Sequence, residues 1–512
     1  MKRSAEFDLP LALLRETLAH ADLLPPIYKK YRPLLADGLC YFLERLPAAR
    51  LKRIFTEQAR MAATVSIAER VVALFHHVPT LHKLGQVVAR DRRLDGGFRA
   101  WLQQLETFQS RISRAEIIRL LEREFKGWRK AGIELGAQAL AEGSVAVAMP
   151  FVWQGGAPPW ASRKGVFKLL KPGIEDRLAE DLAIWPVLGG FLDESCQHYH
   201  LPQLDYNETF EVVRDLLVHE VHLDDEQQRL AQAAKEFEMM TTVHIPALLP
   251  FNTPRLTAME QLEGVTVTED LKQKRPDGLA LAPVIAEALI ARPLFSPRPR
   301  ALFHADPHAG NLFVTSQGRL GILDWSLAGE LEKCDRIELV QLLLGALTLD
   351  PMRMERAVDA LAREPGNRTV LREVLNRALR QLRWGTRPGI GWLTRLLDQI
   401  VIEARVRLKP EFLLFRKSLL TLEGVLADLT RSGERTGDIV IDQTLVSVLL
   451  GQLLIEWPER LQQPFDVRIF GTHLSTTDLM SLFWSGPGSF ARYWTGLLRD
   501  AEYRRFNPSK EA

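Results

Sequence analysis

Cysteine is scarce in this chain, since only Cys40, Cys196 and Cys334 occur in 512 residues. So small and odd a number, spread along the whole chain, excludes a disulfide framework and favours a reducing compartment, the cytoplasm. A surplus of charge of one sign is also absent, because 66 basic residues are balanced by 64 acidic ones. Such a chain has no strong overall field to attract nucleic acid, and we expect no nucleic-acid partner.

A secretory signal and a long apolar run are not evident either. The first ten residues, MKRSAEFDLP, place two acids behind a basic pair and contain no apolar core. The apolar run at residues 445–455 is interrupted by Gly451 and Gln452 and is shorter than the roughly 20 residues that a membrane helix needs. We interpret this run as a buried helix, so any membrane contact should be peripheral, on the cytoplasmic face.

Residues 1–132 are rich in Leu, Ala, Arg and Glu at helical spacing, which predicts an all-helical N-terminal extension. Its clearest helix begins after Ser113, because Ser113 and Glu116 form the pattern of a capping box. Apolar residues continue the stripe of this helix toward Gly132.

The pattern changes after residue 132. Short β-prone runs occur at residues 144–151, 165–170 and 255–259, which predicts a small sheet. Beyond Gly264 the pattern is helical apart from one hairpin. We therefore predict an α+β fold in four parts: the helical extension (1–132), a lobe with the sheet (133–263), a mainly helical lobe (264–430) and a C-terminal helical segment (431–512).

The stretch FHADPHAGNLFVTSQGRLGILDWS, at residues 303–326, predicts a hairpin with an amide and a carboxylate at its mouth. Two apolar β runs flank a turn centred on Gln317 and Gly318, and this register would bring Asn311 opposite Asp324. Oxygen atoms of this kind suit Mg²⁺, which binds through one or two protein ligands while phosphates and water fill its other positions. The sequence therefore predicts a magnesium site.

Asp306 precedes Asn311 by five residues, the spacing found in kinase catalytic loops. From there Asp306 would orient a hydroxyl or accept its proton. The alternative is a surface hairpin with an Asn cap and a solvated Asp. Three residues of these types at this spacing, with His304 before them, favour the phosphate site.

A kinase also needs a cation for the α- and β-phosphates, commonly a strand lysine paired with a helix glutamate. Lys168 lies within the apolar run GVFKLL, and Glu226 falls on the apolar face of a helix predicted from residue 224 to about 239. A buried carboxylate without a cation is costly, so Glu226 either lies in water at a frayed first turn or meets Lys168. We favour the pair.

With these residues in place, the chain resembles the UbiB family of atypical kinases, also called the AarF type. The resemblance rests on HADPHAGN followed by LDW, on KLGQ and on KPGI just past Lys168, and it covers residues from about 75 to 330. It implies a two-lobed protein-kinase-like fold that binds ATP or ADP with Mg²⁺. It also implies that the KxGQ segment, here Lys83, Gly85 and Gln86, folds across the active site and blocks a protein substrate.

The resemblance further implies where the nucleotide binds. The alanine-rich loop that covers the phosphates in this family matches Ala141, Gly143 and Ser144. The segment that joins the lobes, whose backbone would bind adenine, matches Met259 and Glu260.

The chain departs from the family's pattern in three segments. Gly143 stands where the family has alanine, and His222 replaces the aspartate of an E-x-D motif that begins at Glu220. After Asp324 the usual Phe-Gly is replaced by Trp325-Ser326. These departures leave open the preference between ADP and ATP and the role of the E-x-D segment.

From these residues we predict an enzyme, an ATP-dependent phosphotransferase or ATPase. The resemblance implies support of isoprenoid-lipid or ubiquinone biosynthesis, with quinone-biosynthesis proteins as partners. Aromatic and arginine residues interleaved at residues 483–505 suit an anionic or isoprenoid lipid surface, although core packing of a final helix explains them equally well. Two alternatives remain: a small-molecule kinase of the aminoglycoside or choline type, against which KLGQ and KPGI count, and a non-catalytic nucleotide-binding regulatory protein.

Overall fold

The chain divides into two compact units, Met1–Gln228 with Ala247–Gln261 and Arg229–Pro246 with Leu262–Ala512. The four-part division predicted above cuts the chain at other points and stays a prediction. The computed structural model describes residues 8–20, 26–62, 64–75, 77–89, 112–154, 163–201, 210–211, 214, 217–218, 220–272, 280–384, 386, 388–430 and 437–484.

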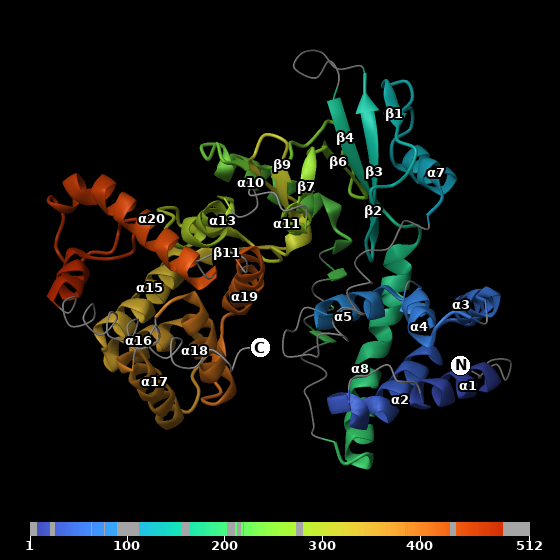
Figure 1. The fold of residues 1–512 in the computed structure, drawn as a ribbon, viewed down its shortest axis with the longest axis horizontal. Coiled ribbons are helices and arrows are strands. Elements are labelled where there is room, and N and C mark those ends of the chain that lie inside the picture. The colour runs from blue at the N-terminus through green and yellow to red at the C-terminus, as the bar shows by residue number, and fades with distance from the viewer. Residues whose placement is uncertain are drawn as a thin grey trace. The chain divides into compact units, whose positions relative to one another are not determined.

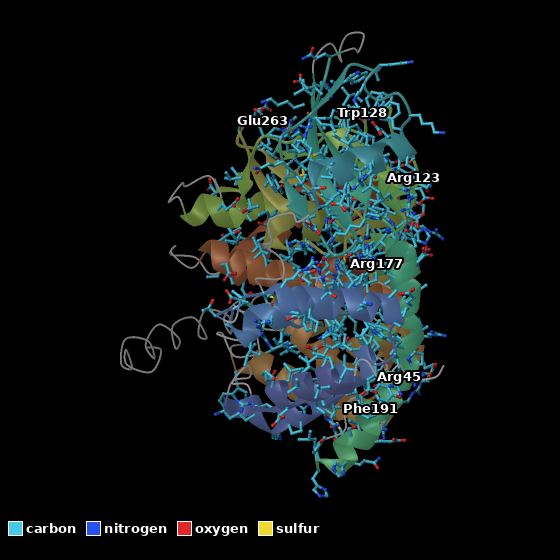
Figure 2. All side chains as sticks on the ribbon, turned by 90° about the vertical axis from the view of Figure 1, so that its right-hand side faces the viewer. Arg45, Arg123, Trp128, Arg177, Phe191 and Glu263 are labelled. Atoms are coloured by element: carbon cyan, nitrogen blue, oxygen red, sulfur yellow. The ribbon has the colours of Figure 1, made fainter. Side chains whose placement is uncertain are left out.

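The described part of the N-terminal extension is helical, as predicted. Its helices are α1 (Asp8–His20), η2 (Pro26–Tyr31), α2 (Arg32–Leu43), α3 (Ala48–Arg60), α4 (Ile67–Phe75), α5 (Pro79–Ala89) and α7 (Arg114–Glu124). A longer helix, α8 (Ile174–His198), follows the strand at Arg163–Leu170. Helix α2 packs against α8 and runs across it (Figure 1). The Tyr41 ring stacks on the Phe191 ring with centroids 4.0 Å apart, and the Arg45 guanidinium lies over the Tyr41 ring, 3.2 Å from its centroid. Figure 2 labels Arg45 and Phe191 in this part of the first unit.

The predicted capping box is confirmed at the start of α7. The Ser113 hydroxyl accepts a hydrogen bond from the Glu116 N–H, and the Glu116 side chain accepts one from the Ser113 N–H. The helix ends at Glu124 and does not reach Gly132, because Phe125 leaves the helical conformation and Gly127 adopts a φ of 88°. Trp128 still packs in the core between α7 and the sheet.

The predicted sheet is present in the first unit. Its strands are β1 (Ile133–Leu135), β2 (Ala141–Glu142), β3 (Ala146–Trp153), β4 (Arg163–Leu170) and β6 (Leu256–Glu260). They are antiparallel in the order β1-β3-β4-β6, with β2 paired to β3 (Figure 1). Buried Phe151 and Phe167 stack at 3.9 Å and pack with α7. The turn-rich stretch between β3 and β4, residues 155–162, lies outside the described residues.

Strands are more numerous after Gly264 than the sequence predicted. The expected hairpin is formed by β9 (Leu312–Thr315) and β10 (Leu320–Ile322). The other strands of the second unit are β5 (Val243–His244) beside β10, β7 (Gly264–Thr266) beside β9, β8 (Arg300–His304) paired with β11 (Ala328–Glu332), and β12 (Ala362–Glu364) paired with β13 (Arg407–Leu408). Strand β8 was missed because four consecutive residues of it are buried, and such a run has no period that distinguishes a strand from a helix.

The rest of the second unit is helical, as expected. Its helices are the C-terminal part of α10 (Leu223–Phe237), α11 (Val267–Lys272), α13 (Ala282–Ala286), η4 (Glu287–Ala291), α14 (Arg292–Leu294), η5 (Ala309–Asn311), α15 (Lys333–Thr348), α16 (Pro351–Leu361), α17 (Arg368–Arg383), α18 (Ile390–Ile402), α19 (Pro410–Thr430) and α20 (Gly437–Arg460).

The apolar run at residues 445–455 is not buried, so the interpretation as a core helix is wrong. The run lies inside α20, which continues through Gly451 because one internal glycine costs only about 1 kcal/mol. Val446, Leu450 and Leu454, spaced four residues apart on one face, are exposed. Within the part of the chain that the structure describes, α20 alone is long and apolar enough to cross a membrane, a criterion of length and composition that helices of soluble proteins also meet.

Candidate functional site

Lys168 and Glu226 form the predicted ion pair. Lys168 lies in the middle of β4, flanked by β3 and β6, and its Nζ is 2.8 Å from Glu226 Oε1. The Glu226 side chain is only 2% exposed, so it does not lie in water at a frayed turn. Its neighbour Gln227 fixes the start of α10 against β6 by donating to the Thr253 carbonyl (2.9 Å) and the Thr257 hydroxyl (3.1 Å). The role of the pair in binding phosphates stays a prediction.

The KxGQ segment connects to the predicted phosphate loop through Glu220. Lys83, in α5, forms an ion pair with Glu220, and the Ser144 hydroxyl donates to the other carboxylate oxygen at 2.9 Å. Gly85 is buried in the same helix, while the side chain of Gln86 lies outside the described part. The carboxylate of Glu220 therefore joins helix α5 to the turn between β2 and β3.

His222, at the position of the missing aspartate, does not join this cluster. It is exposed, and its carbonyl accepts a hydrogen bond from the Glu226 N–H at 3.4 Å. The residue thus stands at the start of α10.

A second attachment of the phosphate loop escaped the sequence analysis. Glu142 Oε1 lies 2.7 Å from Lys171 Nζ, and both side chains are only 8% exposed. The Lys171 N–H also donates to the Val145 carbonyl at 2.9 Å. Burial lowers the pKa of Lys171, while Glu142 opposes that shift. The KPGI motif marks Lys171, but no local pattern predicts its partner across the sheet.

The segment predicted to bind adenine is already hydrogen-bonded. Met259 pairs with Val166 in the sheet, and the Glu260 N–H donates to the Ala247 carbonyl at 2.8 Å. Adenine binding through Met259 and Glu260 stays a prediction, and the Glu260 N–H would have to leave Ala247 to take part.

The hairpin that carries Asn311 and Asp324 has a register one residue away from the predicted one. Leu312 pairs with Ile322, and the Leu323 N–H donates to the Asn311 carbonyl at 2.8 Å. Asn311 thus lies opposite Leu323, and Asp324 comes one residue later. The difference arises because the loop is closed by the Thr315 N–H, which donates to the Arg319 carbonyl, so the turn is centred on Gln317 alone.

His304 holds the two ends of this site together. Its Nδ1 accepts a hydrogen bond from the Asp306 N–H (3.1 Å), and its Nε2 lies 3.0 Å from the Leu323 carbonyl. A neutral imidazole with its proton on Nε2 satisfies both contacts. Burial lowers the pKa of His304, so the neutral ring is favoured. The imidazole fixes Asp306 on one side and the residue before Asp324 on the other.

Asn311 and Asp324 carry oxygen atoms of the kind that bind a divalent cation, and their role as metal ligands stays a prediction. The Asn311 Nδ2 donates to the Asp306 carbonyl at 3.1 Å, which leaves the amide oxygen on the other side of the group as the potential ligand. Asp324 has a φ of 52°, a conformation that is uncommon outside glycine and is often found at functional sites. Mg²⁺ prefers hard oxygen ligands of this kind and keeps several waters or phosphate oxygens. Among the described residues no cluster of three or more His, Cys, Asp or Glu side chains offers a different metal site.

The neutral state of His304 leads to a testable pH dependence. The unfolded histidine, with a pKa of about 6.5, binds a proton as the pH falls, but the buried ring resists it. The stability that His304 contributes should therefore be present above about pH 6.5 and decline below it. In urea unfolding, the stability difference between the wild type and His304→Gln should shrink as the pH falls from about 7.5 to about 5. A difference that stays constant or grows would contradict a neutral His304.

Comparison with known proteins relates this part of the chain to a family. The ABC1 atypical kinase-like domain family matches residues 112–358. Probable protein kinase UbiB of Haemophilus ducreyi is 24% identical over 373 residues, which cover 68% of this chain and 65% of that protein. Probable protein kinase UbiB of Marinobacter nauticus is 25% identical over 285 residues, covering 51% and 49%. The chain belongs to the UbiB/AarF family of atypical kinases. It spans between about half and two thirds of the length of these curated relatives.

Solved structures give more distant likenesses. A complex of Rv3197 with erythromycin from Mycobacterium tuberculosis has a TM-score of 0.47 and 17% identity, covering 62% of this chain and 80% of that chain. A ternary complex of the aminoglycoside phosphotransferase APH(4)-Ia with AMP-PNP and hygromycin B has a TM-score of 0.23 and 13% identity, covering 61% and 99%. At these values no site or ligand is carried over. The UbiB/AarF assignment agrees with the predicted α+β, protein-kinase-like fold.

The structure explains how this UbiB/AarF chain accommodates Trp325-Ser326 after Asp324. The Trp325 ring is buried and contacts the edge of His304 with centroids 4.8 Å apart. The Ser326 N–H donates to Asp324 Oδ1 at 3.3 Å, and the Ser326 carbonyl accepts a hydrogen bond from Arg229. The residues that follow Asp324 are thus fixed by packing and hydrogen bonds, where the family's glycine allows freer rotation.

Proposed function

We propose that this chain is an atypical kinase or ATPase that binds a magnesium nucleotide. The proposal rests on the contacts of His304, whose ring bonds the Asp306 N–H and the Leu323 carbonyl. One side chain therefore holds the loop with Asp306 and Asn311 and the strand end before Asp324. A proton acceptor, an amide oxygen and a carboxylate at the two ends of one hairpin and on the loop before it are the groups that phosphoryl transfer from a magnesium nucleotide uses.

Each side chain then has a role. Lys168, positioned by Glu226, would hold the α- and β-phosphates. Asn311 and Asp324 would hold Mg²⁺, which neutralises charge on the phosphates when it is bound. During transfer, the bond between the γ-phosphorus and the bridging oxygen breaks, and its electron pair leaves with ADP. The oxygen of water or of an acceptor hydroxyl bonds to the γ-phosphorus, and its proton passes to the Asp306 carboxylate.

The family resemblance supports a finer proposal for the pathway. We infer that the activity serves isoprenoid-lipid or ubiquinone biosynthesis, in the cytoplasm or on a membrane face, and that KxGQ disfavours a protein substrate. The contact of Lys83 and Ser144 with Glu220 supports a regulatory role for this segment. The same role for Gly85, Gln86 and His222 rests on the family resemblance alone.

The same contact favours a second candidate, a non-catalytic nucleotide-binding regulatory protein. The Ser144 hydroxyl of the predicted phosphate loop is bonded to Glu220, so it would have to change partner before it could contact a phosphate. Single-turnover hydrolysis of MgATP separates the candidates, because a regulatory protein would bind the nucleotide without releasing phosphate.

Nucleotide-dependent thermal stabilisation tests the proposed site. We expect MgADP and MgATP to stabilise the wild type, by about 2.7 kcal/mol when the ligand concentration is about 100 times Kd. Asp324→Asn should lose the part of this stabilisation that depends on Mg²⁺, because an amide replaces the charged ligand. Repeating the measurement with anionic liposomes shows whether lipid changes the result.

The matched control is Asp359→Asn, on the exposed surface of α16, where Asp359 lies 3.6 Å from Arg368. This change should leave nucleotide stabilisation as in the wild type. Equal stabilisation of the wild type and Asp324→Asn, with and without Mg²⁺, would remove the metal-site proposal.

A further inference from the structure

A lysine outside the segment that matches the kinase family lies beside the proposed catalytic aspartate. Lys417, on α19, has its Nζ 3.8 Å from Asp306 Oδ1. The family match ends at residue 358, so it assigns Lys417 no role. The two side chains are 29% and 13% exposed, which places the ammonium in a partly open position from which a solvent-borne ligand can be reached.

The position of Lys417 is set by its neighbours on α19. The Ser418 hydroxyl, fully buried, donates to the His304 carbonyl at 2.7 Å. The Phe415 ring contacts Phe303 edge to face with centroids 5.1 Å apart. These two contacts fix α19 against β8 at the point where the Asp306 loop begins. Lys417, which lies between Phe415 and Ser418 on α19, is therefore held beside that loop.

The loop between Asp306 and Asn311 contains no lysine or arginine. It contains Pro307, His308, Ala309 and Gly310, and the His308 Nδ1 accepts a hydrogen bond from the Gly310 N–H at 3.1 Å. A phosphoryl group in transfer spreads negative charge over its oxygens and is stabilised by a cation aimed at them. In addition to the proposed metal, Lys417 brings a cation to this end of the site from another element, α19.

We propose that Lys417 is a catalytic residue of this chain that contacts the γ-phosphoryl group as it is transferred next to Asp306. This inference rests on the proposed function. Lys417 stays protonated throughout: the bond from the γ-phosphorus to the bridging oxygen breaks, ADP keeps the electron pair, the acceptor oxygen bonds to phosphorus, and its proton goes to Asp306. The ammonium neutralises charge on the γ-phosphoryl oxygens and brings no bond change of its own.

The geometry also distinguishes this role from a structural one. An ion pair of 3.8 Å between partly exposed groups lies beyond hydrogen-bond distance and contributes little to stability. Removing the charge should therefore leave the fold intact. A large loss of turnover without a loss of stability would show that Lys417 acts on the substrate.

The test compares Lys417→Met and Lys417→Arg with the wild type in the full chain. We expect Lys417→Met to lower kcat for MgATP by about 100-fold, as loss of one cation or donor aimed at developing charge does elsewhere. Binding of MgADP, which has no γ-phosphoryl group, should stay within about 3-fold, while the additional affinity for MgAMP-PNP should be lost. Lys417→Arg should recover part of the turnover, because it keeps the charge.

Lys409→Met is the matched control, because Lys409, the residue just before α19, is also paired with an aspartate, Asp335, at 2.6 Å. It should leave kcat within about 2-fold of the wild type. A kcat of Lys417→Met close to that of the wild type overturns the role of Lys417 but not the proposed function. Equal weakening of MgADP binding and MgAMP-PNP binding has the same meaning. If the wild type binds nucleotide without turnover, the loss of the AMP-PNP preference decides the question. If the wild type binds no nucleotide, the proposed function and this inference both fall.

Discussion

Asp306→Asn is expected to lower kcat for MgATP turnover by about 1,000-fold, within the range of 10²–10⁴ that general acid–base catalysis contributes. The amide has nearly the shape of the carboxylate but cannot accept the proton of the attacking hydroxyl or water. The Asp306 N–H would still donate to His304, and its carbonyl would still accept from Asn311, so the loop should keep its conformation. Initial rates of phosphate release over a range of MgATP concentrations separate kcat from KM.

The expected split between turnover and binding makes this variant informative. MgADP should stabilise Asp306→Asn as much as it does the wild type, because Asp306 is assigned no nucleotide contact. Unfolding free energy should change by less than about 1 kcal/mol, since the ion pair with Lys417 is long and partly exposed. Turnover within a few-fold of the wild type would show that Asp306 is not the proton acceptor.

Lys168→Met is expected to destabilise the first unit by about 3 kcal/mol, at the lower end of the range for breaking a buried ion pair. The change leaves Glu226, only 2% exposed, as a charge on the apolar face of α10 without its lysine. Replacing both residues, in Lys168→Met with Glu226→Met, should recover most of this loss because no buried charge remains. Urea unfolding, monitored by tryptophan fluorescence, gives the free energies of the two variants and the wild type.

The control for this series lies on the same strand. Lys164→Met replaces an exposed lysine of β4 and should change the unfolding free energy by less than about 0.5 kcal/mol. Nucleotide stabilisation should be lost in Lys168→Met and also in the double variant, because the double variant restores stability but not the cation. A double variant that is no more stable than Lys168→Met would mean that the pair is not an isolated buried pair.

Much of the site could be predicted because its residues lie close together in the chain or follow a regular period. Glu226 lies on the same helical face as Leu230, Ala233 and Phe237, and all of these are buried. The apolar run around Lys168 predicts a central strand, and a central strand lysine beside a buried glutamate has few partners to choose from. The pairing of Lys168 with Glu226 therefore followed from periodicity and from the cost of a buried charge.

The register of the hairpin could not be predicted from local patterns in the sequence. Asn311 and Asp324 were expected opposite each other, but Asn311 lies opposite Leu323. The turn-forming residues of this segment suit a loop of four residues, as predicted, and a loop of five residues, as observed. Only the hydrogen bonds between Thr315 and Arg319 select the loop of five. The hydrogen bonds that close the loop, and not the apolar pattern of the strands, decide a shift of one residue in the register.

The amino-acid sequence by itself determined the elements and the chemical groups of this protein: the capped helix after Ser113, the strands around Lys168, and the Asp306, Asn311 and Asp324 set. These follow from local periods, caps and spacing, which act over a few residues. Tertiary structure alone decided that the apolar face of α20 is exposed and that Ser418 meets His304 across 114 residues of chain, with Lys417 beside Asp306. Contacts between distant segments depend on how whole helices and strands pack, and no local period of the sequence records that choice.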